Sequence, residues 1–95
     1  MAVVHYCYTV STTPTLIASI PVGNPLTAVT ISNADNQPIF IGDATVTKTG
    51  ANTGVKVGTG ANTQVWVNAG DKLYGISSAG TAAYAISVLW SNVLS

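Results

Sequence analysis

Charge is what this sequence has least of. Lys and Asp supply three residues each, Arg and Glu are missing, and the formal net charge is zero. Charged residues make up 6% of the chain, against about 25% in an ordinary soluble domain. Binding to nucleic acid needs several Lys or Arg side chains on one face to neutralise phosphates. The composition therefore argues against nucleic acid as a partner.

Cysteine is also scarce, because Cys7 is the only one among 95 residues. A single cysteine rules out an internal disulfide, and the sequence shows no cluster of metal ligands, so we expect neither a metal nor a cofactor. A chain this short buries only about 60–65% of its unfolded surface, which leaves it marginal without further support. Self-association is the support that remains, and we expect a homo-oligomer.

Long apolar runs are absent too. The longest covers Ala82–Trp90 and is interrupted by Ser87, whereas a membrane span needs about 20 apolar residues. The first ten residues, MAVVHYCYTV, have no basic region and no small-residue cleavage site. We expect a chain made in the cytoplasm, with no membrane contact, and a reduced Cys7 is consistent with that compartment.

Helical periodicity is missing, and β-formers fill the sequence instead. Val, Ile, Thr and Tyr favour pleated surfaces, and Gly, Pro, Asn and Asp punctuate the chain at sandwich-like spacing. We predict an all-β, antiparallel, jelly-roll-like β-sandwich with little or no helix, in one domain over residues 1–95. Residues 1–20 are a possible N-terminal strand or arm for oligomer contacts. The strands expected are Val3–Val10, Leu16–Ile20, Thr27–Ser32, Ile39–Gly42, Thr45–Lys48, Val55–Val57, Val65–Val67, Lys72–Ser77 and Ala82–Trp90.

The pentapeptide TGANT occurs twice, at residues 49–53 and 59–63. Gly and Asn reach positive φ cheaply, so each copy is interpreted as a turn between strands. A solenoid needs at least three stacked copies, and a meander would place the two turns at opposite ends of its strands. The repeat therefore indicates two similar turns rather than a binding repeat.

Catalytic combinations are nearly absent. His5 and Cys7 share a strand face, but residues two apart in a strand have Cα atoms about 6.5 Å apart, which is loose for a nucleophile and its base. We therefore interpret the pair as part of a half-buried strand, with a tolerated His and a small apolar Cys. The three aspartates fall in expected turns, where Asp bonds its own backbone. We expect the chain not to be an enzyme.

Four aromatic residues are the candidates for contact with a partner: Tyr6, Tyr8, Trp66 and Trp90. Trp66 alternates with Val65 and Val67, so it faces solvent or a partner if the valines face the core. Exposed Trp is a common interface anchor. Packing in the domain's own core is the alternative for both tryptophans.

Several segments of the C-terminal two-thirds are similar to a known group of proteins. PIFIG (38–42), TVT (45–47), a TG turn (49–50), VWV (65–67) and AGDKLYGISSAGTAAYAISVL (69–89) resemble small β-domains of tailed-bacteriophage virions. That group includes capsid decoration (cement) proteins and the capsid-proximal modules of head fibres. The resemblance covers about residues 29–89, and the first 20 residues match less well.

The resemblance implies a homotrimer at local three-fold positions on the outer surface of an icosahedral capsid. It would bind the major capsid protein and stabilise the assembled head. The alternative is a carbohydrate- or receptor-binding module of a phage fibre or tail, since the same pattern also occurs there.

Overall fold

The computed structural model describes residues 2–93 and contains eight strands and no helix over that range. The strands are β1 (Ala2–Tyr8), β2 (Thr15–Ser19), β3 (Thr27–Asn33), β4 (Ile39–Gly42), β5 (Val55–Val57), β6 (Asn62–Val67), β7 (Lys72–Ser77) and β8 (Ile86–Asn92).

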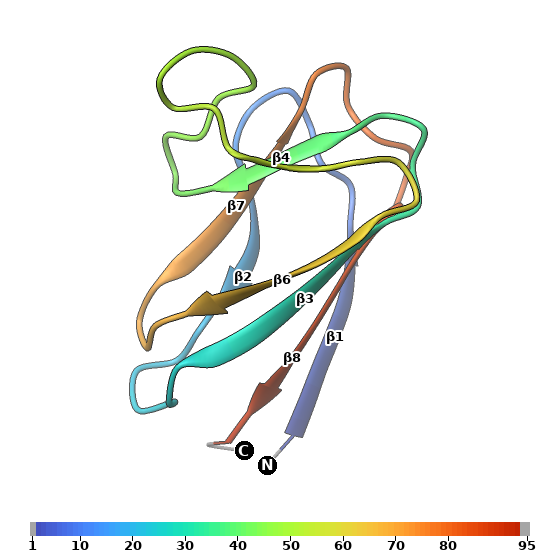
Figure 1. Ribbon diagram of the computed structural model, residues 1–95. Coiled ribbons are helices and arrows are strands. Elements are labelled where there is room, and N and C mark those ends of the chain that lie inside the picture. The colour runs from blue at the N-terminus through green and yellow to red at the C-terminus, as the bar shows by residue number, and fades with distance from the viewer. Residues whose placement is uncertain (1, 94–95) are drawn as a thin grey trace.

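The strands form two four-stranded sheets with the orders β1-β8-β3-β6 and β2-β7-β4-β5 (Figure 1). Every paired neighbour is antiparallel. The pairs β1·β8, β2·β7, β3·β6 and β4·β5 nest inside one another along the sequence, as in a long hairpin rolled up from its β4–β5 tip. This is jelly-roll connectivity, and the all-β antiparallel sandwich predicted from the sequence is confirmed.

The core lies between the two sheets, and alternation along strands such as β3 and β4 directs its side chains inward. In β3, Val29 and Ile31 are fully buried, while the alternate residues Ala28 and Thr30 are half-buried on the other side. Burying each such side chain contributes about 1.5–3 kcal/mol. The core cluster is aliphatic: Val10, Ile17, Ala18, Ile20, Val29, Ile31, Ile39, Ile41, Val57, Val67, Leu73, Ile86 and Val88.

The connection between β4 and β5 differs from the sequence prediction. The expected strand Thr45–Lys48 is wrong, because these residues form a loop with one isolated bridge between Thr47 and Thr53. Asp43 ends β4 by accepting the backbone N–H of Thr45 at 2.9 Å, a local bond that competes with strand pairing. Val46 then turns inward and is 3% exposed.

The two TGANT segments are turns in part. Gly50 and Gly60 have φ angles of 90° and 72°, which suits glycine, and the turns lie at the two ends of β5. The second copy also supplies the first residues of β6, which begins at Asn62. The expectation of a meander is wrong at this point, since β5 and β6 belong to different sheets.

The last strand starts later than expected. Residues 82–85 form a turn in which Ala85 N–H donates to the Ala82 carbonyl at 3.2 Å, and Tyr84 has a positive φ of 56°. β8 therefore begins at Ile86, and the expected strand start at Ala82 is wrong.

Candidate functional site

The outward side of the β1-β8-β3-β6 sheet is a continuous surface without formal charge. Cross-strand partners share a face of a sheet, so the strand registers determine which side chains point away from the core. We call these twelve residues the outer face: Val3, His5 and Cys7 from β1; Ser87, Leu89 and Ser91 from β8; Ala28, Thr30 and Ser32 from β3; Asn62, Gln64 and Trp66 from β6. None of them is Lys, Arg, Asp or Glu.

Three large apolar side chains are exposed on the outer face. Val3 is 68% exposed, Trp66 is 64% exposed and Leu89 is 44% exposed. Val3 pairs with Ser91 and Trp66 pairs with Ala28, so small residues separate the valine at one edge from the tryptophan at the other. Leu89 lies in the next row, opposite His5 and Thr30. The result is a shallow neutral surface with apolar side chains at its centre and both edges.

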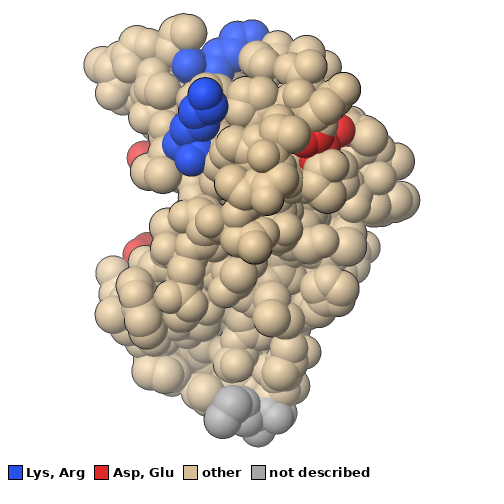
Figure 2. Space-filling model, turned by 45° about the vertical axis from the view of Figure 1, so that its right-hand side comes forward, with Lys and Arg blue, Asp and Glu red and all other residues tan. Residues whose placement is uncertain are grey.

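The charged side chains lie elsewhere. Lys56 and Lys72 belong to strands of the other sheet, and Lys48 lies in the β4–β5 loop, where Nζ donates to the Ser78 carbonyl at 3.2 Å. In Figure 2 the visible charges lie in the upper half, with a red patch toward its right, and at the left margin, and a broad area below them is uncharged. A partner that covers the outer face therefore desolvates no lysine or aspartate of the face itself.

The four candidate aromatic residues do not form one cluster. Trp66 points outward as the alternation predicts, with Val67 buried beneath the sheet. Tyr6, Tyr8 and Trp90 lie on the opposite, inward side, since they pair with Val88, Ile86 and Val4.

The three inward aromatic residues differ in how much of each side chain is exposed. Trp90 and Tyr8 are half-buried and pack against the core. Tyr6 stays 60% exposed at the sheet edge, and its ring centroid lies 5.0 Å from that of Tyr8. Partial burial, with a smaller contribution from Tyr6, raises the pKa of the Tyr8 hydroxyl above its ordinary value.

His5 and Cys7 meet on the outer face. Cys7 Sγ lies 4.0 Å from His5 Nε2 and 3.5 Å from Ser87 Oγ. The contact is longer than a nucleophile and its base require, and the Ser87 hydroxyl contacts the thiol rather than the imidazole. Within residues 2–93 no three His, Cys, Asp or Glu side chains gather into a possible metal site.

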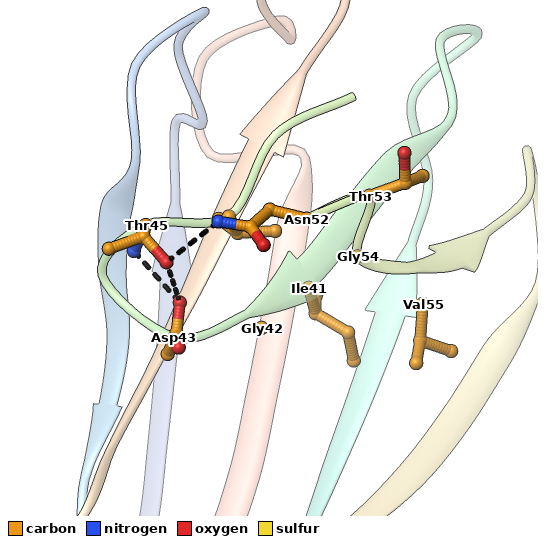
Figure 3. Close-up of a pocket in the computed structure, with 9 residues that line it drawn as sticks. Ile41, Gly42, Asp43, Thr45, Asn52, Thr53, Gly54 and Val55 are labelled. Atoms are coloured by element: carbon orange, nitrogen blue, oxygen red, sulfur yellow. Dashed lines mark hydrogen bonds between the residues drawn. The ribbon is translucent and has the colours of Figure 1, made fainter. Parts of the chain in front are cut away.

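A small hollow opens in the β4–β5 loop, with a volume of about 230 Å³. Asp43 Oδ1 accepts hydrogen bonds from the Thr45 N–H at 2.9 Å and the Thr45 hydroxyl at 2.6 Å, and Asn52 Nδ2 donates to Thr45 Oγ1 at 3.4 Å (Figure 3). The bonds from Thr45 lower the pKa of the Asp43 carboxyl. The polar groups of this hollow bond mainly one another.

This hollow could not be predicted from the sequence, because the pattern of residues 45–48 favours a strand and the structure has a loop there. The sequence also did not predict that the residues of the outer face form one surface. Its residues come from four segments, and only the strand registers bring them together.

Residues 2–93 include no helix long and apolar enough to cross a membrane. Comparison of the chain with protein-family models, with curated proteins and with solved structures returned no match in any of the three searches.

Proposed function

We propose that this chain is a structural virion protein, a capsid decoration protein that binds the assembled phage head as a homotrimer and stabilises it. The observation that carries the proposal is the uncharged outer face with Trp66, Leu89 and Val3 exposed on it. Jelly rolls occur in both viral capsid and lectin domains, so the fold by itself does not select the function.

A neutral face suits a permanent structural contact. Burying an unpaired charge costs several kcal/mol, and the outer face has none to bury. Trp66 supplies the large aromatic anchor typical of the residues that dominate binding energy. The small residues between the edges allow a flat partner surface, such as that of the major capsid protein, to approach closely.

The size of the face explains why several copies would act together. Four strands about 4.8 Å apart, with about 3.3 Å per residue, give the outer face an area of roughly 400 Å². A stable interface buries about 800 Å² on each partner, so a single copy would bind weakly. Linked copies on neighbouring coat subunits gain affinity through effective concentration.

The consequence for the head follows from mass action. A protein that binds only the assembled shell stabilises that shell by an amount that grows with its free concentration. The proposed location is the outer surface of the virion, after synthesis in the host cytoplasm. No catalytic step and no cofactor enters this mechanism.

The alternative, a carbohydrate- or receptor-binding module of a fibre or tail, is favoured by a different surface. Tyr6 is exposed at the sheet edge beside Tyr8, and an exposed ring is a platform for a sugar. Binding on a glycan array that is lost in Tyr6→Ala and retained in Trp66→Ala would select this alternative.

Co-sedimentation with heads of the virus that encodes the chain tests the main proposal. Leu89→Lys places a charge in the middle of the outer face and should abolish binding. Ser19→Lys adds the same charge at an exposed position of β2, in the other sheet, and should bind like the unaltered protein. Equal binding by the two folded variants would contradict the proposal.

A further inference from the structure

The four sheet edges of this sandwich are not alike. An exposed edge strand presents unpaired N–H and C=O groups, and proteins usually block it with charges, bulges or short length. In the β2-β7-β4-β5 sheet both edges are blocked. The register of β2 breaks between Leu16 and Ala18, and β5 has only three residues, with Lys56 at its centre.

Neither edge of the β1-β8-β3-β6 sheet has such protection. β1 is seven residues long, AVVHYCY, and pairs with β8 in unbroken register. β6 is six residues long, NTQVWV. Neither strand contains a Lys, Arg, Asp, Glu or Pro residue, and in Figure 1 no other strand lies beside the edge of β1 that faces away from β8. At alternate residues of each edge strand, the backbone N–H and C=O groups point in the plane of the sheet past its edge. Both edges can therefore accept another strand.

Strand direction determines how the two open edges can combine. Three successive antiparallel pairings separate β1 from β6, so the two edge strands run in opposite directions. β1 of one copy can therefore pair antiparallel with β6 of the next while every copy keeps the same orientation. A head-to-tail contact of this type generates a closed ring when its rotation closes.

We propose that copies of this chain associate head to tail, with β1 of one copy paired to β6 of the next. The register that continues the rows of the outer face sets Val3 opposite Trp66 of the next copy, His5 opposite Gln64 and Cys7 opposite Asn62. On the inward side the same register sets Val4 opposite Val65. All seven residues of β1 then lie beside the stretch 61–67.

This pairing uses the properties of both edges. Val3 and Trp66 are the most exposed large apolar side chains of the outer face, at 68% and 64%, and they lie at opposite edges, where the contact brings them together. No like charges oppose each other along the seam, because neither strand has any. Pairing of β1 with β1 of a second copy would leave both β6 edges open, whereas a ring leaves none. The choice of edges stands on the structure alone, while the ring size of three rests on the proposed function.

Disulfide trapping tests the arrangement on the full chain without heads. Asn62→Cys adds a thiol opposite the native Cys7, and the proposal predicts that mild oxidation gives covalent dimers and then trimers on a non-reducing gel. Ser19→Cys, on β2, is the matched control and should give no trimer. The proposal is overturned if Asn62→Cys gives no covalent dimers and trimers, or if Ser19→Cys gives them in equal amounts.

A second pair guards against misfolding of the first variant. His5→Cys with Gln64→Cys, in a Cys7→Ser background, shifts the bridge by one row and should give the same ladder. If neither variant forms trimers while both keep the circular dichroism of the unaltered protein, the proposal is wrong. Ring formation without binding to heads would reject only the proposed function, and binding to heads without trapping would reject only the ring.

Discussion

Asn33 Nδ2 donates a hydrogen bond of 3.0 Å to the Val57 carbonyl, and this bond joins the end of β3 in one sheet to the end of β5 in the other. Asn33 is fully buried. The same Nδ2 donates to the Gln37 carbonyl at 2.9 Å, and Oδ1 accepts the Asp35 N–H at 2.9 Å. One amide therefore holds together two sheets and the loop between β3 and β4.

Removing this amide should destabilise the whole fold. Asn33→Ala leaves two carbonyls and one N–H without their partner, and each unsatisfied buried group costs about 1–3 kcal/mol. We expect a loss of about 3 kcal/mol in the free energy of unfolding, measured by urea titration. Asn62→Ala, on the exposed start of β6, should change it by less than about 0.5 kcal/mol. Similar values for the two variants would contradict the role assigned to Asn33.

Gly54 should tolerate no side chain. A Cβ at this position would lie 2.5 Å from the Ile41 carbonyl oxygen and 2.6 Å from Val46 Cγ2, so the β4–β5 loop would have to move. We expect Gly54→Ala to lower stability by about 1–3 kcal/mol, the range for overpacking. Gly58→Ala meets no atom within 4 Å and should melt at the same temperature as the unaltered protein or slightly higher. A neutral Gly54→Ala would show that the loop does not pack as described.

The two tryptophans should behave differently. Trp90 packs against the core, so Trp90→Ala should cost about 2 kcal/mol of stability, less than for a fully buried tryptophan. Trp66→Ala removes a side chain that is 64% exposed and should leave the stability of the isolated monomer within about 0.5 kcal/mol while reducing partner binding. Thermal unfolding at low concentration measures both. A larger loss of stability for Trp66→Ala would show that this side chain packs in the core.

Asp43 should give the loop a pH dependence. Hydrogen bonds from the Thr45 hydroxyl and N–H lower the pKa of this carboxyl in the folded protein. The stabilisation is therefore present above the ordinary carboxyl pKa and is lost as the pH falls through the lowered value. Asp43→Asn cannot titrate, so the difference in melting temperature between it and the unaltered protein should shrink between pH 7 and pH 3. A constant difference would show that the carboxylate contributes nothing.

Local pattern in the sequence was enough to predict most strands. Residues 27–33 alternate apolar and polar side chains, and Val29 and Ile31 are buried as that period requires. The outward direction of Trp66 followed from the same rule. These features depend on neighbours in sequence, and no distant contact overrides them.

Long-range features were not predictable in this way. The consecutive strands β5 and β6 belong to different sheets. This division depends on how the long hairpin rolls up over the core, and the local periodicity of the sequence does not encode it. Val46 turns inward because Gly42 and Gly54 leave room for it, and these glycines come from both sides of a long loop. The outer face likewise depends on the registers of four strands. The alternation placed Trp90 on the same face as Ile86 and Val88. It did not show that packing against the core leaves this side chain half-buried.

Cryo-electron microscopy of heads assembled with and without this protein tests the central claim most directly. The account predicts extra density at the three-fold positions of the decorated heads, with the outer face and Trp66 against the coat. Leu89→Lys should remove that density while leaving the protein folded. Heads that look the same in the presence and absence of the protein would contradict the account.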